Sequence, residues 1–265
     1  MACDKLYSFI QNQVKRAIIK SKFKILSGDA QICGEIHGDE HLPCLILLHG
    51  NGEDLHYFDP QICYFRKSYR IIAIDSRAHG LSTRGTKPLD FHTMAEDTLA
   101  VLDALRVEQA HFLGFSDGAN LALHVAIKAP HRIQSMILLG ANYSPSGFRW
   151  DVWIQTRWMH YMLIAASFFS KKAKQKHEIW NLMVHHPKLT LAEIAQIQAP
   201  TLIITGEKDM VSQQENDEIH HAIVGSERVI IAGANHFLSS NRADEFNEIA
   251  ARFLDSTSCV RNCTF

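Results

Sequence analysis

The sequence predicts an α/β protein built on a doubly wound, mostly parallel sheet, with a helical insertion late in the chain. Residues 45–48 and 71–74 are continuous apolar runs, which are typical of strands covered on both faces. Helical stretches separate runs of this kind, and such alternation favours a parallel sheet with helices on both sides. The alternation stops between residues 143 and 200, where no strand is obvious and all four tryptophans of the chain occur.

Each element is predicted from a local pattern. The first two strands form a hairpin around Gly28-Asp29, a pair that favours a tight turn. Apolar residues recur at helical spacing near residue 100 and again in the closing segment. The expected strands cover residues 22–27, 30–37, 45–48, 71–74, 111–113, 136–139, 201–205 and 228–231, and the expected helices cover 58–67, 94–105, 119–126 and 243–254.

Length and composition restrict the function classes. A chain of 265 residues, 46% hydrophobic and 21% charged, suits one large domain with an inserted subdomain. We expect an α/β core at 1–142, which includes an N-terminal helix, and at 200–265, with a helical cap at 143–199. The formal net charge of −1 argues against nucleic acid or an anionic membrane as the main partner. No membrane span is expected, since no run of about 18 apolar residues occurs, and residues 6–20 resemble a basic amphipathic helix rather than a signal peptide.

Cysteine and histidine usage points to free thiols and to no metal site. The six cysteines include Cys259 and Cys263, which have no partners at zinc-ligand spacing. A long chain without a secretory signal favours reduced thiols and a cytoplasmic location. The sixteen histidines include adjacent pairs at 185–186 and 220–221, but neighbours on a helix or strand point in different directions. We therefore expect solvated surface histidines, no metal and no cofactor.

The segment Gly114-Phe115-Ser116-Asp117-Gly118 is the strongest indication of chemistry. It separates a strand-like stretch from a helix-like one, which fits a very tight turn that exposes the serine Oγ. Glycines at both ends avoid collisions with the neighbouring strand and helix. The following helix directs its free N–H groups at an oxyanion formed on a substrate. The alternative is a Gly-rich turn before an ordinary helix.

A serine nucleophile needs a base, and the base needs a carboxylate that orients it. Asp209 is the candidate acid because it follows the strand predicted at 201–205, whose carboxyl end faces the crevice of a parallel sheet. Glu207 and Asp217 are the alternatives. His236 is the candidate base, because it comes after Ser116 and Asp209 and precedes the last helix.

A Gly-rich loop at residues 49–52 follows the apolar strand at 45–48. At the carboxyl end of a strand, such a loop can turn a backbone N–H toward the serine. The N–H of Asn51 is the expected first donor of an oxyanion hole, and the N–H of Asp117 is the second. Phosphate binding is disfavoured, because the loop lacks the Lys-Ser/Thr ending of a P-loop.

The tryptophan-rich interval is predicted to form a cap whose inner face lines an apolar pocket. The alternative is that its aromatic side chains only bury one another. Asp117 also admits two roles: it caps the helix that follows it, or it attracts a cationic group such as the α-amine of an amino-acid ester. The candidate pocket residues are Asp117, Trp150, Trp153, Trp158 and Phe237.

The Gly-rich loop, the serine turn, the acid and the histidine follow one another along the chain in an order that resembles the α/β-hydrolase fold superfamily. Residues 75–82, Asp-Ser-Arg-Ala-His-Gly-Leu-Ser, resemble its D-x-R-G-x-G-x-S loop, with Ala78 in place of the usual glycine. Ala199-Pro200 before the acid strand also matches, and the resemblance spans roughly residues 22–254. The segments that look most like the biphenyl-hydrolase-like branch are 116–118, 206–209 and 242–246.

The resemblance implies an eight-stranded sheet and hydrolysis of esters, amides, lactones or C–C bonds without a cofactor. Serine at position 116 argues against haloalkane dehalogenases, which carry aspartate there, and dienelactone hydrolases, which carry cysteine. We expect a serine hydrolase that cleaves a small ester or related acyl compound through a Ser-His-Asp triad and an acyl-enzyme. The alternatives are a small-molecule receptor that keeps the triad and a lyase of the same fold.

Overall fold

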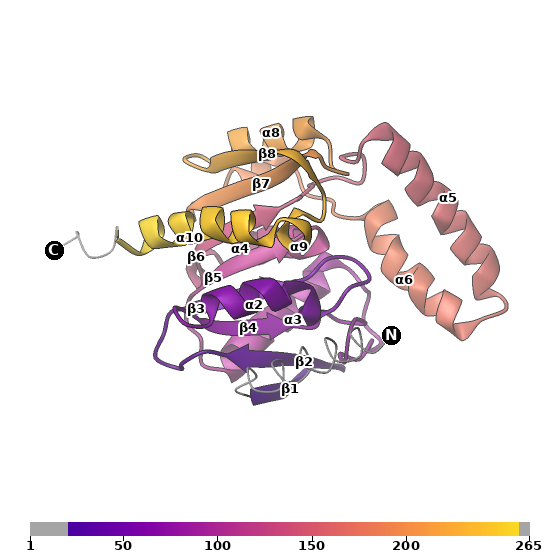
Figure 1. Ribbon diagram of the computed structural model, residues 1–265. Coiled ribbons are helices and arrows are strands. Elements are labelled where there is room, and N and C mark those ends of the chain that lie inside the picture. Colours follow the sequence, from indigo (N-terminus) through magenta and orange to yellow (C-terminus); the bar gives the residue numbers. More distant parts are fainter. Residues whose placement is uncertain (1–20, 260–265) are drawn as a thin grey trace, which may run out of the picture.

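An eight-stranded sheet crosses the molecule in the order β1-β2-β4-β3-β5-β6-β7-β8 (Figure 1). The computed structural model describes residues 21–259, so the helix expected at 6–20 and Cys263 lie outside the described residues. The pairs β1–β2 and β2–β4 are antiparallel, and the other neighbours are parallel. The strands are β1 (Ser21–Ser27), β2 (Ala30–His37), β3 (Cys44–Leu48), β4 (Arg70–Ile74), β5 (Ala110–Phe115), β6 (Ile133–Leu139), β7 (Thr201–Lys208) and β8 (Glu227–Asn235).

Helices cover both faces of the sheet. Successive residues of β3 point to opposite sides: Ile46 packs in the core below α3 and α4, and Leu47 packs in the core below α2 and α10. This double burial explains why the central strands are uninterrupted apolar runs. The helices outside the insertion are η1 (Leu55–Phe58), α2 (Asp59–Phe65), α3 (Phe91–Ala104), α4 (Asp117–Lys128), η2 (Pro130–Arg132), α8 (Gln213–Ala222), α9 (Leu238–Asn241) and α10 (Ala243–Cys259).

This architecture confirms the predicted fold class. Among the strands, the largest difference in length is at the edge of the sheet, where β7 and β8 extend beyond the expected segments. They continue to pair through an irregularity near Gly206 as far as the Lys208–Asn235 pair. Hydrogen bonds between strands thus extend past the apolar residues from which the strands were predicted.

The interval at 143–199, called the cap below, contributes α5 (Trp150–Ser167), α6 (Lys171–His185) and the short α7 (Leu191–Ile194). α5 and α6 form a hairpin that projects beside the sheet, with α5 on the outer side (Figure 1). The indole Nε1 of Trp180 donates to the carbonyl oxygen of Thr156 at 2.9 Å, which joins the two helices. Within the described part of the chain, no helix is long and apolar enough to cross a membrane.

The loop after β4 keeps a left-handed turn although alanine replaces the usual glycine. Ala78 has a φ of 67°, which costs a residue with a side chain about 1 kcal/mol of strain. The neighbouring Arg77 is fully buried, and its Nε and Nη2 each lie 2.7 Å from a carboxylate oxygen of Asp97. This bidentate ion pair fixes the loop against α3, which carries Asp97.

His49 joins the loop after β3 to the loop after β4. Its buried Nδ1 lies 2.8 Å from the carbonyl oxygen of Gly50, and its Nε2 accepts the N–H of Ser76 at 3.0 Å. Because a carbonyl oxygen only accepts, Nδ1 carries the proton and the ring is neutral. Burial, reinforced by the neighbouring His79, lowers the pKa of His49 to about 3. The residue thereby positions the loop that carries Asn51.

The neutral, buried His49 makes stability depend on pH. Folding lowers its pKa from 6.5 to about 3, so between these values the unfolded chain binds more protons. The stabilisation is complete above about pH 6.5 and is lost as the pH falls toward 3. We expect His49→Leu to lower the free energy of unfolding at pH 7 by about 1–3 kcal/mol, because the Ser76 N–H loses its acceptor. The difference from the parent protein should shrink between pH 7 and pH 4 in urea unfolding, and a constant difference would contradict this role.

Candidate active site

Ser116 lies in a strained turn between β5 and α4. Its φ of 52° and ψ of −117° are rarely adopted by a residue with a side chain. The turn is tight because α4 begins against β3: a Cβ at Gly118 would collide with the carbonyl group of Leu48, and a Cβ at Gly114 would collide with Gly118. The N–H of Ser116 donates to the carbonyl oxygen of Leu139 at 2.8 Å. This is the geometry of the turn that is called a nucleophile elbow in hydrolases of this kind of sheet.

Asp209 and His236 are in direct contact. Nδ1 of His236 lies 2.6 Å from Oδ1 of Asp209, and both side chains are buried. The N–H of Val211 donates to the same carboxylate oxygen at 3.0 Å, which orients the acid. Phe237, a candidate pocket residue, packs edge-on against the ring of His236 with the centroids 5.6 Å apart.

The two other acids considered for this role contact different groups. Glu207 accepts a backbone N–H of β8 at 2.7 Å, and Asp217, on α8, forms an ion pair with Arg228. The structure therefore brings Asp209, and neither alternative, to the imidazole of His236.

The loop after β6 contacts both the imidazole of His236 and the elbow at Ser116. A Cβ at Gly140 would lie 2.7 Å from Cε1 of His236, and Gly140 directly follows Leu139, which accepts the N–H of Ser116. The rings of His236 and Phe115 are 4.8 Å apart. Within residues 21–259, no hydrogen bond joins the Oγ of Ser116 to the imidazole. Catalytic hydrogen bonds are often long before a substrate binds and tighten in the complex.

The backbone groups expected to bind an oxyanion are free. In the described part of the chain, the N–H groups of Asn51 and Asp117 meet no acceptor. Asp117 is the first residue of α4, where N–H groups lack partners within the helix and carry its positive end. An anion that forms beside Ser116 can accept from these groups.

The carboxylate of Asp117 is buried beside Ser116, with no Lys or Arg partner among residues 21–259. Its Oδ2 accepts from the side-chain Nδ2 of Asn51 at 2.8 Å, and the same Nδ2 donates to the carbonyl oxygen of Ile179 in α6 at 2.9 Å. The carboxylate therefore contacts Asn51, and it also lies in the first turn of α4, where the helix dipole favours a negative charge. Burial raises the pKa of Asp117 to about 6. A positive charge placed beside it would be favoured.

Glu53 is a further acid near the elbow, and no sequence pattern identifies it. Its Oε2 is buried without a hydrogen-bond partner in the described residues, and it would lie 3.2 Å from a Cβ at Gly50. Burial raises the pKa of Glu53 to about 7. The burial arises from packing against Gly50 and its surroundings, which a local pattern does not reveal.

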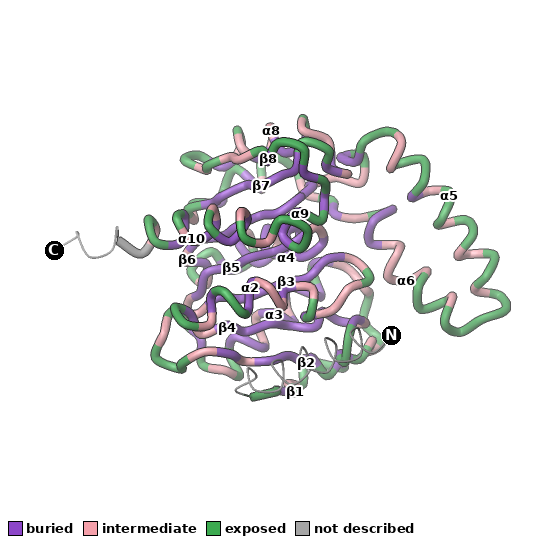
Figure 2. The backbone as a smooth tube through the Cα atoms, in the orientation of Figure 1, coloured by how far each residue is buried: buried purple, intermediate pink, exposed green. Residues whose placement is uncertain are grey.

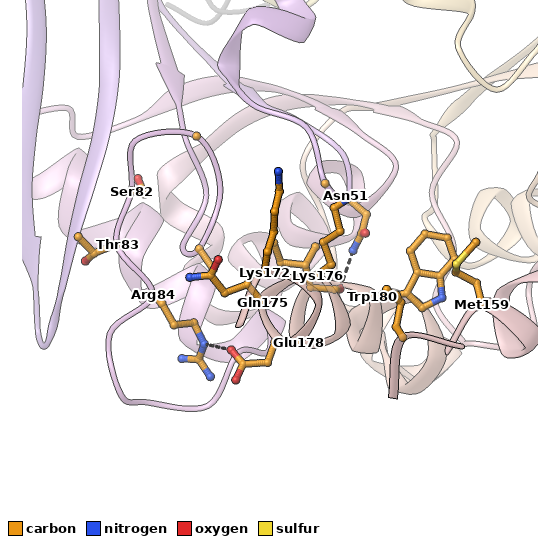
Figure 3. A pocket seen from close by; sticks show the side chains of 15 residues that line it. Asn51, Ser82, Thr83, Arg84, Met159, Lys172, Gln175, Lys176, Glu178 and Trp180 are labelled. Atoms are coloured by element: carbon orange, nitrogen blue, oxygen red, sulfur yellow. Dashed lines mark hydrogen bonds and ion pairs between the residues drawn. The ribbon is translucent and has the colours of Figure 1, made fainter. Parts of the chain in front are cut away.

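A cavity of about 780 Å³ lies between the cap and the loops after β3 and β4 (Figure 3). The ion pair between Arg84 and Glu178, at 2.9 Å, joins the loop after β4 to α6 at this cavity. Asn51 connects the cavity to the elbow, because its side chain contacts Asp117. The lining includes Asn51, Ser82, Arg84, Met159, Lys172, Lys176 and Trp180.

The structure does not bring the candidate tryptophans of α5 to this cavity. Trp150 is 78% exposed and Trp158 is 61% exposed, and Trp153, half-exposed, is also absent from the lining. Trp180 of α6 and Met159 of α5 line the cavity instead. The sequence did not reveal which face of α5 turns inward, because apolar residues occur all round this helix.

Comparison with known sequences agrees with the geometry. A sequence profile described as the alpha/beta hydrolase fold matches residues 43–180. Human serine hydrolase BPHL is 31% identical over 235 residues, which cover 82% of this chain and 80% of that protein. The 3-oxoadipate enol-lactonase 1 of Acinetobacter baylyi is 25% identical over 253 residues, which cover 84% and 92%. The match to BPHL agrees with the resemblance to the biphenyl-hydrolase-like branch.

Solved structures show the same topology. The enol-lactonase from Burkholderia xenovorans superposes with a TM-score of 0.74 at 22% identity, covering 88% of this chain and 100% of that one. The match of the profile, the identity to the human relative and the eight-stranded sheet lead to one conclusion. This chain is an enzyme of the α/β-hydrolase fold family.

Proposed function

We propose that the protein is a serine hydrolase that cleaves a small ester through an acyl-enzyme, with Ser116 as nucleophile, His236 as base and Asp209 as orienting acid. The observation that carries the proposal is the buried 2.6 Å contact between His236 and Asp209, made beside a serine with a φ of 52°. An alkyl hydroxyl is a weak nucleophile at neutral pH, and this arrangement supplies the base that it needs.

In the first half of the proposed reaction, Ser116 Oγ attacks the ester carbonyl carbon while Nε2 of His236 takes the hydroxyl proton. Asp209 stabilises the imidazolium through Nδ1. The carbonyl oxygen becomes an oxyanion that accepts from the N–H groups of Asn51 and Asp117. Collapse of this intermediate breaks the C–O bond, and the alcohol leaves with the proton held by His236.

In the second half, water attacks the acyl group and gives a proton to His236. The second tetrahedral intermediate collapses, the carboxylic acid leaves, and Ser116 recovers its proton. The net change is ester plus water to acid plus alcohol. The enol-lactonase among the relatives supports C–O cleavage, because a lactone is a cyclic ester.

A second feature bears on the substrate: Asp117 is a buried carboxylate without a Lys or Arg partner in the described chain. Under this proposal it binds an ammonium group on the acyl portion, such as the α-amine of an amino-acid ester. A charge-assisted hydrogen bond to a desolvated carboxylate is stronger than a neutral one. The backbone N–H of Asp117 remains available for the oxyanion.

Ser116→Ala tests the nucleophile. We expect kcat for 4-nitrophenyl acetate to fall by about four to six orders of magnitude, because no acyl-enzyme can form. Alanine retains the backbone of the elbow, so the melting temperature should change little. A fluorophosphonate probe should label the parent protein and leave the variant unlabelled. Near-normal esterase activity in a folded variant would disprove the assignment, and a parent protein that is neither labelled nor active would favour the receptor.

Asp209→Asn and Glu207→Gln form a matched pair that tests the acid. Each change replaces one carboxylate by its amide at the carboxyl end of β7. We expect the first to lower kcat by about four orders of magnitude, because the amide no longer holds the required imidazole tautomer, and the second to leave kcat within about threefold of the parent. The reverse pattern, measured at equal thermal stability, would identify Glu207 as the acid.

Asp117→Asn tests recognition of an amine with two esters that differ only in that group, benzyl valinate and benzyl 3-methylbutanoate. We expect the parent enzyme to prefer the valine ester by about tenfold or more in kcat/KM, and the variant to lose this preference mainly through KM. Because the carboxyl has a pKa of about 6, the preference should decline as the pH falls below 6. Equal kcat/KM for both esters in the parent would exclude amine recognition, and the assignment of the triad would still stand.

A further inference from the structure

An exposed stripe of large apolar residues runs along the outer side of α5. Its members are spaced four, four, three and seven residues apart, so they lie within about 80° of one another around the helix axis. Figure 2 shows most of this helix exposed. The aromatic stripe, as we name it, consists of Trp150 (78% exposed), Ile154 (52%), Trp158 (61%), Tyr161 (65%) and Phe168 (81%), and it continues into Phe169 (93%).

The stripe is not required for the packing of the cap. Thr156 is the only fully buried residue among those of α5, and the contact of its carbonyl group with Trp180 lies on the side facing α6. Contiguous apolar patches on a protein surface mark interaction sites. Trp and Tyr in particular combine an apolar ring with a polar edge, which suits a boundary between water and an apolar phase.

Lysines gather where the stripe ends. α6 begins at Lys171, after its N-cap Ser170, and its first two turns carry exposed lysines with no acidic residue in the first turn. Cations are unfavourable at this end of a helix, because the macrodipole is positive there. None of these lysines forms an ion pair within the described residues. They are Lys171 and Lys174, whereas Lys172 and Lys176 line the cavity.

We propose that the aromatic stripe and the adjoining lysines dock the cap on the surface of an anionic lipid bilayer. The rings of the stripe would enter the boundary between headgroups and acyl chains, and the ammonium groups would contact lipid phosphates and carboxylates. The helix lies on the membrane and does not cross it. The overall net charge of −1 conceals this local excess of positive charge.

The charges of the hairpin favour lipid over a second copy of this chain. The acidic residues of α5 and α6 are Asp151, which pairs with Arg149 at 2.7 Å, and Glu178, which pairs with Arg84 at 2.9 Å. A second copy meeting this face would offer no unpaired carboxylate from these helices to the lysines. An anionic bilayer supplies both an apolar layer and unpaired negative charge.

Cosedimentation with vesicles tests the proposal on the full chain. We expect binding to phosphatidylcholine vesicles containing one third phosphatidylserine, and binding at least about tenfold weaker to phosphatidylcholine alone, because each lysine near the surface contributes to the attraction. All four tryptophans lie in the cap, so their fluorescence should shift to shorter wavelength on binding. Binding that is absent, or equal for both vesicles, would overturn the proposal.

Three double variants separate the contributions. Phe168→Ser with Phe169→Ser, and Lys171→Gln with Lys174→Gln, should each weaken binding to the anionic vesicles by about tenfold or more. Leu26→Ser with Val224→Ser removes apolar residues that are 74% and 88% exposed elsewhere, and it should leave binding unchanged. Equal loss in this control would overturn the assignment. A dimer in analytical ultracentrifugation that the Phe168 and Phe169 substitutions dissociate, together with absent vesicle binding, would also overturn the proposal.

Discussion

The close approach of α4 to β3 is the constraint on which the active site depends. Only a hydrogen atom at Gly118 fits against the carbonyl group of Leu48, so the start of α4 is held beside the loop that carries Asn51. The chain must then turn abruptly after β5, which forces Ser116 to a φ of 52°. The strain, about 1–3 kcal/mol, is offset by the burial of β5 and of most of α4. The proposed nucleophile and the proposed oxyanion donors are therefore positioned by the same packing.

Buried polar contacts join the remaining loops to this elbow. Asn120, in the first turn of α4, exchanges two hydrogen bonds of 2.9 Å with Asn142, which lies in the loop after β6. Glu215 of α8 accepts the N–H groups of Tyr143 and Ser144 at 2.9 Å, where the chain leaves the sheet for the cap. Satisfied buried polar groups restrict the arrangement of neighbouring segments more than apolar contacts do. The apolar core supplies stability, and these contacts determine how the loops meet.

Features carried by a short segment could be predicted from the sequence, and features that depend on distant segments could not. The central strands, the elbow at Ser116 and the position of His236 before the last helices follow from local patterns and chain order. The partner of Asp117 does not, because Asn51 is 66 residues away from it in the sequence. Asn51 in turn contacts Ile179, which is 128 residues away from Asn51. The burial of Glu53 and the raised pKa that follows from it depend in the same way on tertiary packing.

The orientation of α5 is the clearest case of information absent from the local pattern. A helix that buries one face and exposes the other to water shows an apolar stripe, which identifies the buried face. In α5, Met159 and Leu163 line the cavity, while Trp158 and Tyr161, their near neighbours, are exposed on the other side. A helix with an apolar environment on both sides has no reason to segregate its residues. The uniform pattern that concealed the orientation is thus what the proposed placement of α5, between the cavity and a lipid surface, requires.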